Sequence, residues 1–134
     1  MRKVVAVLLL LVMASAVTGC GGDTADDRKE QAKYQRITAD EAQVLMQKER
    51  DYLVLDVRSP EEYAEGHIPH AINIPMEQFG EDPPKELPDR NQTIFVYCVK
   101  GIRSMNVANR LAHMGYKNII EMGGIQDWHG KIVK

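Results

Sequence analysis

Cys98 is the residue whose type and position most clearly suggest chemistry. It directly follows a short apolar run, residues 93–97, that has the composition of a buried strand, and a helix-forming segment begins a few residues later. In α/β proteins, nucleophiles and ligands lie where a strand ends and a helix begins. Backbone N–H groups of the connecting loop, residues 99–103, can point inward, and the helix adds the positive end of its dipole. Both effects favour a thiolate, so we expect Cys98 to be a nucleophile.

The residues after Cys98 also suit an anion. Gly101 relieves steric restriction in a tight loop, and Ser104 can form a hydrogen bond near the helix start. Lys100 and Arg103 add positive charge. The alternative interpretation is that Cys98 belongs to the core and that the basic side chains are merely solvated.

Three further polar residues could take part in chemistry: Asp56, Arg58 and His67. An aspartate and an arginine at the end of a strand suit either catalysis or structural bracing, and an imidazole could act as a base. The histidines of the chain are not spaced as metal ligands. We therefore expect no metal and no cofactor.

The composition is that of one small globular domain. Apolar residues make up 44% and charged residues 27% of the 134, and the chain after residue 19 is long enough to form a core without disulfides. The formal net charge is -2, and no cluster of lysines and arginines follows a phosphate backbone. We therefore expect no nucleic-acid partner.

From Arg36 onward, strand and helix signals alternate, which predicts an α/β fold with helices on a parallel or mostly parallel sheet. Capping-box patterns at 38–41 and 59–62 mark two helix starts. We expect helices from Thr38 to about Lys48, over 60–64 and over 104–114, strands over 52–57, within 66–75, over 93–97 and over 118–122, a surface connection over 80–92, and a helical tail after Trp128.

The first twenty residues have the pattern of an export signal. A short positive head precedes an uncharged apolar run, residues 4–17, and small residues lead to Cys20. The run is shorter than the roughly 20 residues of a spanning helix, which leaves a permanent transmembrane helix as the alternative. Residues 17–20 resemble the bacterial lipobox, whose cysteine is lipidated and becomes the new N-terminus after cleavage.

This resemblance implies three parts: a lipoprotein signal peptide over 1–19, a lipidated Cys20 on a flexible polar tether over 20–35, and a folded domain over 36–134. It places the protein at the bacterial cell envelope, outside the cytoplasm, on the periplasmic face if the cell has two membranes. The acyl chains on Cys20 would then be its membrane contact.

Four motifs together resemble the rhodanese family, specifically its single-domain members. They occur in the family's order and cover nearly all of residues 36–130. The resemblance implies a rhodanese-like fold, with a central, mostly parallel sheet flanked by helices on both faces. The motifs are D-V-R at 56–58, the E-E-[FY]-x-x-G-H-I-P-x-A-x-N-I-P stretch at 61–75, C-x-x-G-x-R-S at 98–104, and G-G-[IVLM]-x-x-W at 123–128.

The resemblance also implies a sulfurtransferase that works through a Cys98 persulfide. The thiolate would take sulfane sulfur from a small donor such as thiosulfate, release sulfite, and pass the sulfur to a thiol or cyanide. In this family, residues such as Asp56, Arg58 and His67 usually brace the structure, and we expect a monomer. The substrate-binding residues would be Val99, Lys100, Gly101, Ile102, Arg103 and Ser104.

Two positions depart from the family pattern. Glu62 stands where the two-domain members carry an arginine, which removes one positive contact for thiosulfate. His70 stands where glycine is commonest, and we interpret it as a tolerated loop change. The first departure affects donor preference more than the chemistry.

Two other functions compete with sulfur transfer. Cysteine phosphatases and arsenate reductases also hold an anion over a thiolate, but their arginine follows the cysteine by six positions, whereas Arg103 follows Cys98 by five. The second alternative is a non-catalytic persulfide carrier or thiol redox sensor at the cell envelope, with Cys98 cycling slowly between oxidation states.

The lipid anchor predicts that cells expressing the full chain with labelled palmitate will incorporate label into it. The Cys20→Ala variant should carry none, because the acceptor thiol is absent. Gel fluorography of the immunoprecipitated protein measures the label. Label that survives in Cys20→Ala would contradict the anchor.

Overall fold

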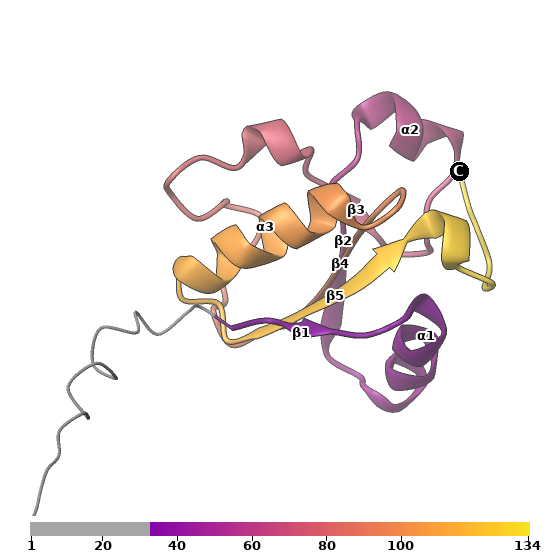
Figure 1. The fold of residues 1–134 in the computed structure, drawn as a ribbon, viewed down its shortest axis with the longest axis horizontal. Helices are drawn as coiled ribbons and strands as arrows, with labels where there is room; N and C mark the ends of the chain where they lie inside the picture. The colour runs from indigo at the N-terminus through magenta and orange to yellow at the C-terminus, as the bar shows by residue number, and fades with distance from the viewer. Residues whose placement is uncertain (1–32) are drawn as a thin grey trace, which may run out of the picture. The chain divides into compact units, whose positions relative to one another are not determined.

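The computed structural model describes residues 33–134, at whose centre lies a five-stranded parallel sheet (Figure 1). The strand order is β1-β5-β4-β2-β3, and every pairing in the sheet is parallel. This confirms the α/β fold with a parallel sheet. The strands are β1 (Gln35–Arg36), β2 (Tyr52–Asp56), β3 (Ile72–Asn73), β4 (Thr93–Cys98) and β5 (Asn118–Gly124).

Both predicted capping boxes are present and start the first two helices. The Thr38 hydroxyl accepts the Glu41 N–H, and the Ser59 hydroxyl accepts the Glu62 N–H, while each glutamate side chain accepts the N–H of its cap residue. The helices are α1 (Ala39–Lys48), α2 (Pro60–Glu65) and α3 (Ile102–His113), with short 3-10 helices η3 (Met76–Gln78) and η4 (Ile125–Asp127).

The expectation of a helical tail is wrong. The last helical turn, η4, ends at Asp127, and the chain then continues without helix or strand, with a bend at Gly130, until Val133 forms an antiparallel bridge with His67. The Trp128 indole N–H donates to the Lys131 carbonyl at 3.0 Å. Pairing with a distant loop thus replaces the local helix in this segment.

The two faces of the sheet bury separate apolar clusters, because successive residues of a strand point to opposite faces. Ile94 and Val96 pack with Leu111 of α3 on one face, whereas Phe95 and Tyr97 pack with Ala42 of α1 on the other. In Figure 1, α3 and α1 lie on opposite sides of the sheet, as the resemblance implied.

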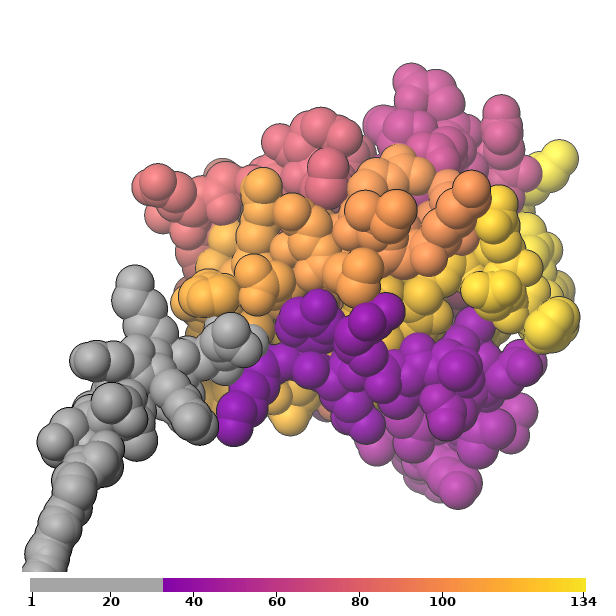
Figure 2. All heavy atoms as spheres, viewed as in Figure 1, coloured from indigo at the N-terminus to yellow at the C-terminus, as the bar shows by residue number. Residues whose placement is uncertain are grey.

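The predicted surface connection 80–92 lies beside α3 (Figure 2). The guanidinium of Arg110 donates to the carbonyl of Phe79 at 2.6 Å, and the side chains of Phe79 and Leu87 are buried. The connection therefore completes the core on the α3 side, although its backbone runs over the surface.

The predicted signal peptide and Cys20 lie outside the described residues. The last three residues of the predicted tether, 33–35, are among the described residues. Tyr34 packs against the α3-side cluster, and Gln35 pairs with Ile120 of β5. None of the helices within residues 33–134 is long and apolar enough to cross a membrane.

His70 has a positive φ of 68°. This is the left-handed region, where a Cβ costs roughly 1 to 2 kcal/mol per residue. A glycine has no such cost, which gives a physical reason for the glycine that the resemblance implies at this position. The His70 side chain is exposed, so its replacement disturbs no packing.

We predict that His70→Gly raises the free energy of unfolding by about 0.5 to 1 kcal/mol, because relief of the strain exceeds the extra entropy of glycine in the unfolded chain. Urea denaturation followed by circular dichroism measures the change. His70→Ala is the matched control: it removes the same imidazole and keeps the strained Cβ. An equal effect of the two substitutions would show that the backbone strain is not the cause.

Candidate active site

Cys98 is the last residue of β4, at the carboxyl edge of the sheet. Its sulfur atom Sγ accepts the backbone N–H of Gly101 at 3.0 Å and that of Ser104 at 3.4 Å. Gly101 has a φ of 107°, a left-handed conformation that turns the loop so that α3 begins at Ile102. The loop amides therefore face the sulfur, as the position between a strand and a helix predicts.

Cys98 is only 1% exposed, but its side chain lines a cavity of about 280 Å³. The other residues that line this cavity are Val99, Lys100, Ile102 and Arg103. Five of the seven residues predicted for the site thus line one cavity, while the backbone N–H groups of the other two, Gly101 and Ser104, donate to the sulfur.

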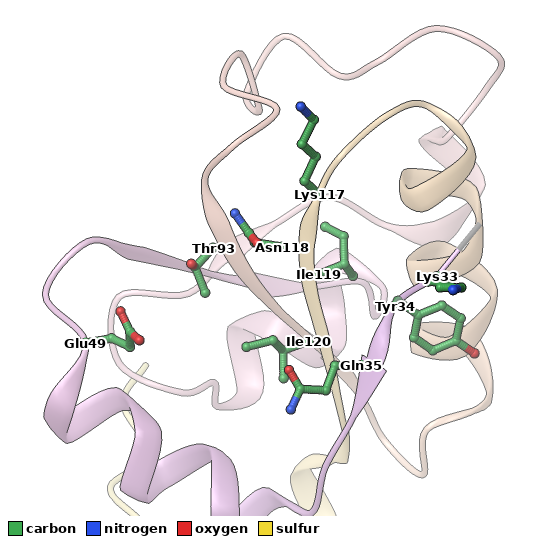
Figure 3. A pocket seen from close by; sticks show the side chains of 9 residues that line it. All are labelled: Lys33, Tyr34, Gln35, Glu49, Thr93, Lys117, Asn118, Ile119 and Ile120. Atoms are coloured by element: carbon green, nitrogen blue, oxygen red, sulfur yellow. The ribbon is translucent and has the colours of Figure 1, made fainter. Parts of the chain in front are cut away.

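A larger cavity, of about 460 Å³, lies at the opposite edge of the sheet (Figure 3). Its lining includes Thr93 and Asn118, the first residues of β4 and β5, and Glu49 at the end of α1. No cysteine or histidine lines it. We therefore place the chemistry at the smaller cavity.

Gly124, the last residue of β5, allows the loop after Cys98 to lie close to this strand. A Cβ on Gly124 would lie 1.7 Å from the carbonyl oxygen of Val99, so only glycine fits there. The same carbonyl accepts the N–H of Gln126 at 3.4 Å. The glycine pair of the fourth sequence motif thus allows the loop to approach β5.

Arg103 forms a bidentate ion pair with Glu62 at the start of α2, with N···O distances of 2.9 and 3.1 Å. The hydrogen bonds from Arg103 are the main reason why the pKa of Glu62 falls to about 2, and the same contact raises the pKa of Arg103. Glu62 therefore neutralises the arginine that lines the cavity.

The family is decided by comparison with known proteins. The model of the family "Rhodanese-like domain" matches residues 38–131. The chain belongs to this family. The thiosulfate sulfurtransferase PspE of Escherichia coli is 40% identical over 73 residues, which are 54% of this chain and 70% of the relative. The thiosulfate sulfurtransferase GlpE of Coxiella burnetii is 35% identical over 96 residues, 71% of this chain and 87% of the relative.

Solved rhodanese structures share the fold. A structure described as "rhodanese with anions from E. coli" is 37% identical, with a TM-score of 0.57 and coverage of 62% of this chain and 98% of that one. A rhodanese-related protein from Thermoplasma volcanium is 31% identical, with a TM-score of 0.63 and coverage of 75% and 98%.

In this rhodanese-like domain, Asp56 and Arg58 form a buried ion pair. The Arg58 Nη2–Asp56 Oδ2 distance is 2.6 Å, and Arg58 Nη2 also donates to the carbonyl of Gly66 at 2.7 Å. Burial acts to lower the pKa of Arg58, but its bonds to Asp56 raise it. The Tyr97 hydroxyl donates to Asp56 at 2.6 Å, and burial together with this bond raises the pKa of Tyr97. The pair therefore contacts the residue just before Cys98.

His67 contacts Tyr63 and Val133 and is not among the residues that line the Cys98 cavity. Its ring stacks on that of Tyr63 at a centroid distance of 3.7 Å, and its Nδ1 lies 2.9 Å from the Tyr63 carbonyl oxygen. Its backbone exchanges hydrogen bonds with Val133. Across residues 33–134, no three histidine, cysteine, aspartate or glutamate side chains gather as metal ligands would.

Sequence reasoning missed Glu121, which the structure places against Ser104, near the start of α3. It is 1% exposed, and its carboxylate accepts the Ser104 hydroxyl at 2.6 Å. The sequence holds one signal for it: a glutamate inside the apolar run 118–122, which a buried strand does not contain without a partner.

Proposed function

We propose that this domain transfers sulfane sulfur through a persulfide on Cys98. The observation that carries the proposal is the pair of backbone N–H groups, of Gly101 and Ser104, that donate to Sγ beside a cavity. Such donors favour a sulfur anion in a water-poor site. The relatives named thiosulfate sulfurtransferase support the same reaction.

In the first step, the Cys98 thiolate attacks the outer sulfur of a donor such as thiosulfate. A bond forms between Sγ and that sulfur, the sulfur–sulfur bond of the donor breaks, and sulfite leaves with its electron pair. In the second step, a thiolate or cyanide attacks the outer sulfur and Cys98 leaves as the thiolate. Covalent catalysis divides the transfer into these two displacements.

Donor preference follows from the charges at the cavity. Thiosulfate is a dianion, and the cavity offers Lys100 together with an Arg103 that is already paired with Glu62. We infer that thiosulfate is a modest donor for this domain and that Glu62 is the residue that limits it.

A persulfide carrier or thiol redox sensor is the second candidate, favoured by the 1% exposure of Cys98. A sulfur atom enclosed in this way would react slowly and would retain the sulfane sulfur of its persulfide. For either function we propose the same location, the bacterial cell envelope, with Cys20 as the lipid anchor.

The persulfide predicts that the purified chain, incubated with thiosulfate, gains the mass of one sulfur atom and releases stoichiometric sulfite. Cys98→Ser should show neither, whereas the control Cys20→Ala, which lacks the chain's other cysteine, should show both. Intact-protein mass spectrometry and a sulfite assay measure the two products. Transfer that persists in Cys98→Ser would refute the function. Multiple turnovers with cyanide would indicate an enzyme, and a single turnover a carrier.

The Arg103–Glu62 pair predicts that Glu62→Gln lowers the KM for thiosulfate by about two- to fivefold, because a partly exposed charge pair contributes about this much. Glutamine keeps the oxygen that accepts the Ser59 N–H and removes the charge. Since the pKa of Glu62 is about 2, wild type and variant should differ equally at any pH above about 4. Glu61→Gln, an exposed neighbour, is the control, and an equal effect there would exclude a specific pairing.

A further inference from the structure

Glu121 of β5 is a buried carboxylate that the proposed mechanism does not use. Its Oε1 accepts the hydroxyl of Ser104 at 2.6 Å and the N–H of Gly123 at 2.8 Å, while its Oε2 accepts Nε of Arg36, on β1, at 3.1 Å. Arg36 is 60% exposed, so its charge is largely solvated, whereas that of Glu121 is enclosed. The carboxylate thus lies directly behind the catalytic loop.

Ser104 connects this carboxylate to the reacting sulfur. Its Oγ lies 3.4 Å from Cys98 Sγ and 2.6 Å from Glu121 Oε1, and Ser104 is fully buried. A hydroxyl has one proton to donate, and the nearby carboxylate is the stronger acceptor. The serine oxygen therefore presents lone pairs to Cys98. It can accept an S–H, but it opposes a negative charge on Sγ.

Formation of the persulfide relieves the repulsion between the Ser104 oxygen and a negative charge on Sγ. Its negative charge lies on the outer sulfur, about 2 Å from Sγ, the length of a sulfur–sulfur bond. The outer sulfur occupies the cavity side, where Lys100 and Arg103 lie. Loading thus moves charge away from Ser104 and Glu121.

We propose that Glu121, acting through Ser104, is a positioning residue that disfavours negative charge on Cys98 Sγ and thereby favours the persulfide over the free thiolate. Only the part of this proposal that concerns the persulfide rests on the proposed function. The loading step conserves atoms and charge, because a thiolate and the thiosulfate dianion give a persulfide anion and the sulfite dianion. The charged groups around this array are Arg36 from β1, Glu121 from β5, Lys100 from the loop, Arg103 from α3, Glu62 from α2, and Glu77 from η3.

The first test is the pH profile of Cys98 alkylation by iodoacetamide in the full chain. Glu121→Gln keeps an acceptor for Ser104 and Gly123 and removes the charge. The midpoint of this variant should therefore lie about one pH unit below that of wild type, so that at pH values below both midpoints the variant holds about tenfold more thiolate. Arg36→Gln removes the counter-charge of Glu121 and should move the midpoint the opposite way. Because Arg36 is exposed on an edge strand, this variant remains informative even if Glu121→Gln does not fold.

Two further variants distinguish a positioning role of Glu121 from a merely structural one. In a Ser104→Ala background, Glu121→Gln should shift the midpoint less than half as far, because the hydroxyl that transmits its effect is absent. Glu49→Gln, at the opposite edge of the sheet, should cause no shift. A Glu121 that merely held the Gly123 turn would leave the midpoint unchanged in both Glu121→Gln and Arg36→Gln, and that result overturns the proposal.

The second test is the ratio of persulfide to thiol in a fixed mixture of thiosulfate and sulfite, at a pH above all the alkylation midpoints. Mass spectrometry should find this ratio about three- to tenfold lower in Glu121→Gln than in wild type. An equal or higher ratio overturns the proposal. If wild type takes up no sulfur, the proposed function fails, and the alkylation profiles still decide whether Glu121 acts on Cys98.

Discussion

The site depends on one constraint: the backbone must turn tightly enough after β4 to aim two N–H groups at Cys98 Sγ. The turn requires a left-handed residue, supplied by Gly101, and a neighbouring strand without a side chain, supplied by Gly124. It also requires a helix that begins at once, so that the Ser104 amide is still free of an intrahelical partner. Sulfur, loop and helix start therefore form one unit.

The parallel sheet makes this unit possible and fixes its surroundings. Parallel strands β2 and β4 end at the same edge, which places Asp56 opposite Tyr97. The Tyr97 hydroxyl donates to the Asp56 carboxylate and accepts the N–H of Ile68, and Arg58 satisfies the remaining carboxylate positions. A buried ion pair is retained only when its hydrogen bonds are complete, and here the completed set fixes the residue that precedes Cys98. The Cys98 side chain, one residue later, packs on the opposite face of the sheet.

What the sequence could predict was local. The capping boxes at Thr38 and Ser59 and the loop around Cys98 depend on neighbours within a few residues, and the family motifs added the fold. The sequence could not predict contacts between distant segments: Arg103 with Glu62, or Val133 with His67. The Val133–His67 contact explains why the predicted helical tail is absent. The Arg103–Glu62 contact shows that Arg103 is already paired. The sequence marks His70 as a departure from the family pattern, but it gives no sign of strain, which follows only from the φ of 68° in the structure.

The balance of charge around Cys98 gives the loop amides their importance. Each nearby arginine has a carboxylate partner: Arg103 with Glu62 in front of the loop, and Arg36 with Glu121 behind it. Paired cations attract an anion weakly, so we assign the stabilisation of a sulfur anion mainly to the backbone N–H groups, with Lys100 as a further positive group at the cavity. The N–H groups carry no titratable charge, and salt screens buried partners little. On the proposed function, these two carboxylates are the adjustable part of the site: Glu62 would affect which donor approaches, and Glu121 where the negative charge lies.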